Sequence, residues 1–200
     1  MPNIHKLIWS KFGIKNGDTP PFSGAPWNME GSRRSLAEVM GEEGFKIGAE
    51  IGVEKGHYSK VLCESIPDVK LYCVDPWMPY GRNSKGREDY LYVKAQQRLA
   101  GCNVEIMRMT NVEAAKQIEN GSLDFVYIDA LHDFDSVMVD IITWVPKVRS
   151  GGIISGHDYC ILYGYGVIPA VNAYVFAHNI SPFYVTTYVP EYVSWFFVKP

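Results

Sequence analysis

Short apolar runs alternate along the chain with stretches in which apolar residues recur at helical spacing. Leu91, Ala95 and Leu99, for example, stand four residues apart and mark one face of a helix. The runs between such stretches are rich in Val and Ile, which is typical of buried strands. Predicted strands cover residues 46–52, 71–74, 104–107, 123–128 and 153–155. Strands and helices that alternate in this order predict a parallel sheet with helices on both faces.

The C-terminal part of the chain shows a different pattern. Two apolar runs, 183–189 and 193–198, are separated only by Pro-Glu-Tyr at 190–192, which predicts a hairpin whose last strand is antiparallel. The fold expected is therefore α/β, a doubly wound, mostly parallel seven-stranded sheet with an antiparallel C-terminal strand. Residues 1–30 are rich in Pro, Gly and Asn and are expected to form an irregular N-terminal arm, with residues 31–200 as one domain.

Composition narrows the class of protein. With 200 residues, 47% of them hydrophobic, the chain is large enough for a substantial core. A net charge of -3 gives no basic footprint for a nucleic-acid partner. No apolar run approaches the roughly 18 residues of a membrane span, and residues 1–15 do not resemble a signal peptide. The four cysteines are scattered, which argues against a disulfide framework and for a reducing, cytoplasmic location.

A glycine turn follows the strand over residues 46–52. Its pattern is Gly52-x-x-x-Gly56, and the next strand ends in Asp75. The Gly-x-Gly-x-x-Gly that brings backbone amides onto a pyrophosphate is missing. The sequence therefore predicts a ligand with a nucleoside but no diphosphate, with the Asp75 carboxylate on the ribose hydroxyls. Alternatively, the glycines only allow strand and helix to pack, and Asp75 caps a loop.

These features together resemble a known family. The segment 50–56, Asp75, Asp129 after the fourth strand, and the C-terminal hairpin are similar to class I S-adenosylmethionine-dependent methyltransferases. Residues 128–134 and 151–159 resemble the Asp-Gly-x-His-x-Tyr and Gly-Gly-x-x-x-x-His-Asp-Tyr segments of a group near the macrocin and catechol O-methyltransferases. The resemblance implies a Rossmann-like fold, S-adenosyl-L-methionine as cofactor, and O-methylation of a small-molecule hydroxyl. Ala130 and Phe134 depart from the pattern, replacing Gly and Tyr.

The resemblance also implies which residues hold the cofactor. Glu50 would help to hold the methionine amino group, and the hydroxyls of Tyr58 and Ser59 would meet its carboxylate near a helix N-terminus. Trp77 packs either on the adenine or in the core. The expected cofactor-binding residues are Glu50, Gly52, Val53, Gly56, Tyr58, Ser59, Asp75, Pro76, Trp77, Met109, Thr110, Asn111 and Asp129.

Four residues are the candidates for catalysis: Asp129, His132, His157 and Asp158. In the catechol-type relatives the acid matching Asp129 binds Mg²⁺ with an Asp-Asn pair. That pair corresponds here to His157-Asp158, and because hard cations prefer oxygen ligands, a metal at Asp129, His157 and Asp158 is not favoured. His132 matches the position of the general base in those relatives, and an imidazole that titrates near neutral pH could take a hydroxyl proton. His157 is the second candidate base, and a capping or surface role is the alternative for His132.

Other interpretations stay open at this point. An NAD-dependent oxidoreductase would need the missing glycine pattern, and a non-catalytic protein could retain the methyltransferase fold. A metal-dependent, hydroxylase-like relative is a further alternative. Loops 78–89 and 159–165 are expected to border the acceptor pocket. The aromatic C-terminal hairpin could form a homodimer face, although core packing would explain the same residues.

Overall fold

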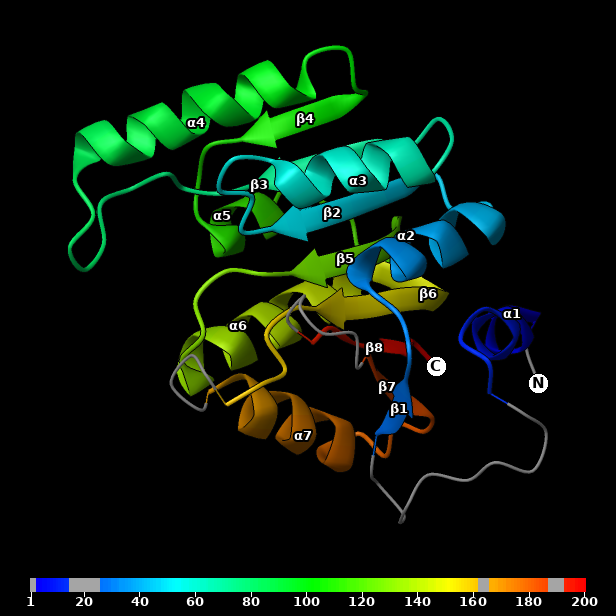
Figure 1. Cartoon of the computed structure of the whole chain (residues 1–200). Helices are drawn as coiled ribbons and strands as arrows, with labels where there is room; N and C mark the ends of the chain where they lie inside the picture. Colours follow the sequence, from blue (N-terminus) through cyan, green and yellow to red (C-terminus); the bar gives the residue numbers. More distant parts are fainter. Residues whose placement is uncertain (1–2, 15–25, 162–165, 187–192) are drawn as a thin grey trace.

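A computed structural model describes residues 3–14, 26–161, 166–186 and 193–200. In this part of the chain eight strands form a single sheet in the order β1-β7-β8-β6-β5-β2-β3-β4 (Figure 1). The strands are β1 Trp27–Met29, β2 Ile47–Ile51, β3 Lys70–Val74, β4 Val104–Met107, β5 Leu123–Ile128, β6 Val148–Gly156, β7 Phe183–Thr186 and β8 Trp195–Val198. All neighbouring pairs are parallel except β6–β8 and β7–β8. The α/β fold class and the antiparallel C-terminal strand are thus confirmed, with eight described strands in place of the seven predicted.

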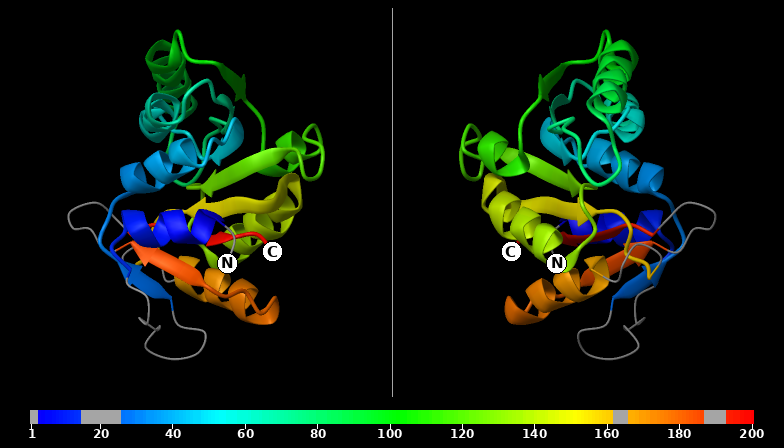
Figure 2. Two further views of the ribbon diagram at one scale, coloured as in Figure 1. Left: turned by 90° about the vertical axis from the view of Figure 1, so that its right-hand side faces the viewer. Right: turned by 90° about the vertical axis from the view of Figure 1, so that its left-hand side faces the viewer.

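Helices cover both faces of the sheet. They are α1 Asn3–Lys11, α2 Arg33–Glu42, α3 His57–Ser65, α4 Lys85–Leu99, α5 Asn111–Ala115, α6 Phe134–Trp144 and α7 Val167–Ala177, with a 3-10 turn η1 at Val145–Lys147. Leu36, Leu62 and Leu91 belong to one core cluster with α1, whereas α5, α6 and α7 contribute to a second. The two layers lie on opposite sides of the sheet (Figure 2). Each layer buries the apolar stripe that the helical spacing predicts.

The order of the strands reverses next to β2. This strand pairs with β3 on one side and with β5 on the other, both in parallel. The chain therefore leaves the sheet in opposite directions at this point, and the carboxyl ends of β2 and β5 border the crevice in which open α/β sheets bind ligands. The glycine turn follows β2, and Asp129 follows β5.

The N-terminal residues differ from the irregular arm expected. Helix α1 buries Ile4 and Ile8 against the core, Phe12 directly after the helix is buried there too, and β1 pairs with β7. The indole Nε1 of Trp9 also donates a hydrogen bond to the Tyr184 hydroxyl at 3.1 Å. The spacing of Ile4, Ile8 and Phe12 marks an amphipathic helix that the high content of Pro and Gly nearby obscured. A domain boundary at residue 30 stays a prediction.

One of the expected loops also differs. The polar loop expected over 78–89 ends earlier, because Ser84 caps α4 by accepting a hydrogen bond from the Arg87 amide at 3.3 Å. Residues 162–165 of the other loop and the hairpin turn at 187–192 lie outside the described residues.

Core packing accounts for the aromatic residues of the last strands. Tyr184, Trp195, Phe196 and Phe197 are all buried within the subunit, which agrees with the core alternative to a dimer face. Among the helices in the described ranges, none has both the length and the apolar character required to cross a bilayer.

Candidate functional site

The glycine turn brings the ends of β2 and β5 into close contact. Gly52 has φ +90°, and a Cβ placed on it would overlap the carbonyl oxygen of Asp129. Its amide donates to the Val74 carbonyl at 2.8 Å. Gly56, with φ +71°, forms the N-cap of α3. Gly52 therefore has a structural role at the crevice, whether or not a ligand lies over it.

Asp75 organises the loop that follows the turn. Its Oδ2 accepts hydrogen bonds from the amides of Val53 at 3.0 Å and Glu54 at 2.9 Å, and its Oδ1 accepts from the amide of Trp77 at 2.8 Å. Burial raises the pKa of this carboxyl, and the three amide hydrogen bonds oppose that rise. Because a carboxylate offers about four lone-pair sites, Asp75 retains room for a ligand hydroxyl.

Trp77 lies in the core. Its side chain is buried, the ring stands edge-on to Tyr92, and the indole Nε1 donates to the Glu54 carbonyl at 2.9 Å. This placement favours the core interpretation over stacking on an adenine. Pro76, half-buried, connects Trp77 to Asp75.

Glu50 is a buried acid at the end of β2. It accepts a hydrogen bond from the hydroxyl of Ser59, and burial is the main reason that its pKa rises to about 8. The hydroxyl of Tyr58 donates to the backbone carbonyl of Arg33 at 2.9 Å. The two hydroxyls that were expected to meet the methionine carboxylate are thus already bonded to the protein.

The residues after β4 lie at the same edge of the sheet. Thr110 caps α5 and forms a reciprocal pair of hydrogen bonds with Glu113. Asn111 begins that helix, and the Met109 sulfur accepts a hydrogen bond from Gln117 at 3.1 Å. Met109, Thr110 and Asn111 are all half-buried. They follow β4, which pairs with β3, the strand that Asp75 directly follows.

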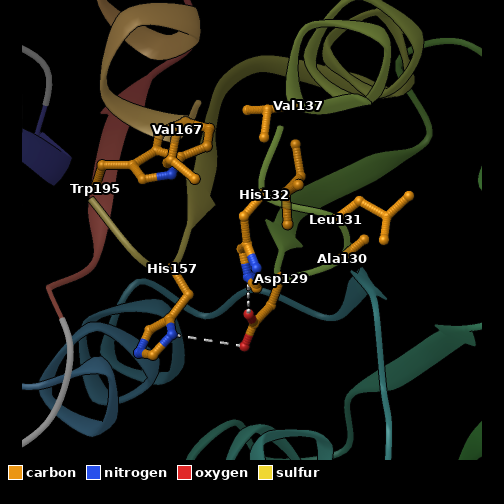
Figure 3. Close-up of a pocket in the computed structure, with 9 residues that line it drawn as sticks. Asp129, Ala130, Leu131, His132, Val137, His157, Val167 and Trp195 are labelled. Carbon is orange, nitrogen blue, oxygen red and sulfur yellow. Dashed lines mark ion pairs between the residues drawn. The ribbon is translucent and has the colours of Figure 1, made fainter. Parts of the chain in front are cut away.

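The four catalytic candidates converge where β5 and β6 end. The Nε2 atom of His132 lies 2.8 Å from Oδ2 of Asp158 and 4.0 Å from Oδ1 of Asp129. The Nδ1 atom of His157 lies 3.2 Å from Oδ1 of Asp158 and 3.8 Å from Oδ2 of Asp129. Figure 3 shows both imidazoles directed toward Asp129. Asp158 has φ +54°, a left-handed conformation that is uncommon for a residue with a side chain.

Two carboxylates determine the charge of His132. Asp129 and Asp158 together raise its pKa to about 9. Burial would raise the pKa of Asp158, but hydrogen bonds from His132 and His157 outweigh burial and hold it well below its usual range. His132 therefore carries a proton at neutral pH, in contrast to the neutral imidazole that a general base requires.

A pocket opens beside these residues. Val137 from α6, Val167 from α7 and Trp195 from β8 form its apolar side, and His132 and His157 approach it from the other (Figure 3). Its other lining residues are Ile128, Asp129, Ala130 and Leu131. A molecule bound here would meet apolar walls and a charged floor.

The donor atoms suit a divalent cation as well as a proton. One ligand atom each from Asp129, His132 and Asp158 lie within 4.8 Å of one another. This set contains His132 in place of the His157 named in the sequence analysis. Two carboxylate oxygens and one imidazole nitrogen suit Mn²⁺ or another transition-metal ion better than Mg²⁺, provided that His132 is deprotonated.

Arg33 is the member of the site that sequence reasoning missed. Its guanidinium Nη1 lies 4.0 Å from Oδ2 of Asp129, and its Cζ lies 5.2 Å from the centroid of the Tyr58 ring. The sequence shows only an arginine after the helix cap Ser32, and nothing in that pattern marks it as facing the crevice.

A family comparison identifies the domain. Residues 49–159 match the model of a family described as a methyltransferase domain. The chain belongs to this family. The matched segment contains the glycine turn, Asp75 and all four catalytic candidates, and it confirms the predicted methyltransferase domain.

Solved structures support the fold of this methyltransferase domain. An O-methyltransferase from Bacillus cereus, solved in complex with SAH, superposes with a TM-score of 0.60 at 15% identity and covers 98% of this chain and 90% of its own. The O-methyltransferase TomG from Streptomyces achromogenes, solved with SAM, gives a TM-score of 0.62 at 14% identity. The match covers 98% of this chain and 89% of the TomG chain. At this level of identity the likeness concerns the architecture.

A curated relative is longer than this chain. The uncharacterized protein y4gI of Sinorhizobium fredii is 27% identical over 124 residues, which is 59% of this chain and 14% of that protein. The chain thus spans only a small part of the length of this relative.

Proposed function

We propose that this methyltransferase domain transfers a methyl group from S-adenosylmethionine to a hydroxyl oxygen of a small molecule. The observation that carries the proposal is the position of the glycine turn and Asp75 beside a His–Asp cluster, at adjoining strand ends of one crevice. The solved O-methyltransferases with SAH and SAM share this architecture, which supports the choice of cofactor.

The cofactor would lie across the ends of β2, β3 and β5. Asp75 would accept from the ribose hydroxyls, with Met109, Thr110 and Asn111 beside the adenine. Glu50 and Asp129 would face the positively charged amino group. In this orientation the sulfonium would point toward the pocket next to His132 and His157.

The chain's own residues would align the acceptor and remove its proton. The hydroxyl oxygen attacks the methyl carbon in line with the S–C bond, the new C–O bond forms as the S–C bond breaks, and S-adenosylhomocysteine leaves. We assign the released proton to His132, which can accept it only in its neutral form. Asp158, 2.8 Å away, orients this imidazole and stabilises the imidazolium that results. His157 is the alternative base.

A divalent cation is a second way to supply positive charge at this point. Asp129, His132 and Asp158 would hold it. When bound, such a cation would polarise the acceptor hydroxyl as a Lewis acid. Removal of the hydroxyl proton by neutral His132, oriented by Asp158, needs no metal, so we favour the metal-free form.

The residues that line the pocket suggest the class of acceptor. Val137, Val167 and Trp195 favour an apolar or aromatic body, and the charged groups opposite favour a hydroxyl that points at His132. We also place the reaction in the cytoplasm, where the free cysteines stay reduced; nucleic acid is not an expected partner. A homodimer remains a prediction.

Calorimetry with S-adenosylhomocysteine and NAD⁺ tests the proposal. We expect micromolar binding of S-adenosylhomocysteine and no binding of NAD⁺; the reverse would favour the oxidoreductase. Incubation with S-adenosylmethionine labelled in its methyl group, together with a panel of phenols and alcohols, then tests for transfer. Tight cofactor binding with no transfer to any acceptor would favour a non-catalytic protein that retains the fold.

A further inference from the structure

Arg33 occupies a defined position at the crevice. It begins α2 directly after Ser32, whose side chain accepts a hydrogen bond from the Arg34 amide at 3.2 Å. From there the guanidinium reaches the end of β5, where its Nη1 lies 4.0 Å from Oδ2 of Asp129. With 29% of its side chain exposed, Arg33 is accessible to a ligand in the crevice.

Tyr58 holds Arg33 at two points. The Tyr58 hydroxyl donates to the Arg33 carbonyl at 2.9 Å, and the Tyr58 ring lies beneath the guanidinium. That ring is itself fixed by Tyr127, whose centroid is 4.1 Å away. A guanidinium held in this way loses little conformational freedom when a ligand binds, which favours affinity.

The charges around Arg33 match those of an α-amino acid. Arg33 is a cation close to two acids, Glu50 and Asp129, and its charge favours the ionised form of Glu50. A zwitterion could place its ammonium against the two carboxyls and its carboxylate against the guanidinium. Arg is well suited to this task because its planar fork can donate two parallel hydrogen bonds to one carboxylate.

The apolar side of the acceptor pocket lies on the other side of the sheet from Arg33. It is built by α6, α7 and β8, whereas α2 belongs to the layer with α1, α3 and α4 (Figure 1). Arg33 is therefore placed toward the cofactor end of the crevice, next to Glu50. It also supplies what the hydroxyls of Tyr58 and Ser59 do not, since both of these are bonded within the protein.

We infer that Arg33 binds the α-carboxylate of the methionine part of the cofactor, and through it sets the specificity for an intact amino-acid end. This inference rests on the proposed function and names a contact that the sequence had assigned to Tyr58 and Ser59. Arg33 acts as a binding residue and takes no part in proton transfer.

Calorimetry with two ligands tests the inference. S-adenosylmethionine and its decarboxylated form share the nucleoside, the sulfonium and the ammonium, and differ only in the carboxylate. For the wild type we expect binding of the decarboxylated form to be about 10- to 100-fold weaker, the range of a charge-assisted hydrogen bond. Arg33→Ala should weaken the binding of S-adenosylmethionine by the same factor. Its affinity for the decarboxylated form should stay within about twofold of that of the wild type.

Arg34→Ala provides a matched control. Arg34 is the next residue, half-exposed, and its Nη2 lies 3.9 Å from a carboxylate oxygen of Glu64. This variant should bind both ligands as the wild type does. Arg33→Lys, which keeps the charge but not the fork, should fall between the wild type and Arg33→Ala and guards against a folding defect in the alanine variant.

Three results would overturn the inference. Equal weakening of both ligands by Arg33→Ala would mean that Arg33 only shapes the crevice. Unchanged binding of both ligands, with a raised KM for the acceptor, would assign Arg33 to the acceptor. Failure of the wild type to bind S-adenosylmethionine at all would overturn the proposed function itself, and is distinguished from the other two by the wild-type titration alone.

Discussion

The Nε2 atom of His132 and the Oδ2 atom of Asp158 lie 2.8 Å apart, although the two residues follow different strands. The contact joins the ends of β5 and β6 and places a charged pair at the edge of the pocket. Because Asp129 also faces His132, the pKa of the imidazole is raised to about 9, and the ring keeps its proton at neutral pH. The proposed base is therefore active mainly in alkaline solution.

The rate of methyl transfer should depend on pH through His132. We expect kcat/KM to rise with pH, to reach half of its maximum near pH 9 and to level off above it, because only the neutral imidazole accepts a proton. Asp158→Asn removes one of the charges that favour the imidazolium, and should move this rise toward the ordinary histidine pKa of 6.5. A pH–rate profile of both proteins checks the direction of the shift.

Substitution of each histidine identifies the base. His132→Gln should lower kcat by about 10²- to 10⁴-fold and remove the alkaline rise, while leaving the affinity for S-adenosylhomocysteine within about twofold. His157→Gln serves as the matched variant. If His157→Gln removes the rise and His132→Gln does not, the roles of the two residues are exchanged.

Metal addition and removal separate the two forms of the site. With the metal-free form favoured, EDTA should leave the rate unchanged. Below pH 9, the affinity of Asp129, His132 and Asp158 for Mn²⁺ should rise about tenfold for each unit by which the pH increases, because the cation displaces the His132 proton. Loss of activity in EDTA, restored by Mn²⁺ or Mg²⁺, would show that the metal-free form is inactive.

The buried carboxyl of Glu50 should link stability to pH. Its pKa lies at about 8 in the folded chain against 4.5 in the unfolded chain, so the folded state binds more protons between these values. The free energy of unfolding should therefore fall with pH across that window, by up to about 1.4 kcal/mol per pH unit from this group. Below pH 4.5 both states are protonated and the contribution is constant.

Glu50→Gln should remove this dependence. The variant keeps a hydrogen-bonding side chain of similar size, and its stability relative to the wild type should increase from pH 4.5 to 8 in denaturant titrations. Glu105→Gln, at a half-exposed ion pair with Lys70, is the control and should show no such trend. A constant difference between Glu50→Gln and the wild type at all pH values would contradict a raised pKa for Glu50.

Asp75 should be needed for the nucleoside. Asp75→Asn keeps the size of the side chain but replaces one acceptor oxygen by a donor, so we expect about 10- to 100-fold weaker binding of S-adenosylhomocysteine. Asp124→Asn is a fair control, because Asp124 also accepts two backbone amides, those of Lys46 and Ile47, but at the opposite end of the sheet. It should reduce stability without changing affinity; equal losses of affinity in the two variants would count against a specific role of Asp75.

The sequence allowed the strand ends to be predicted, and with them most of the site. A glycine turn after β2 and acids after β3 and β5 can be read from local pattern, because the carboxyl ends of parallel strands share one edge of the sheet. For the same reason the segments with His132 and with Asp158 could be expected to meet. Their separation, which determines the charge of His132, depends on side-chain packing that no spacing encodes.

The features that were missed depend on contacts between distant segments. Arg33 reaches the crevice only because α2 packs beside α3, where Tyr58 fixes it. The hydroxyl of Ser59 was assigned to the ligand, but the buried carboxyl of Glu50 takes it instead. Local pattern identifies which side chains have the right chemistry, and tertiary packing decides which of them are available.

The pairing of β1 with β7 has a consequence for the order of events during synthesis. Trp27 lies beside Tyr184 in the sheet, so β1 has no partner until β7, more than 150 residues later, has been synthesised. Helix α1, whose Trp9 bonds to the same Tyr184, must wait as well. The central strands can associate earlier, and the N-terminal segment then joins last, which makes its docking a late and separable step of folding.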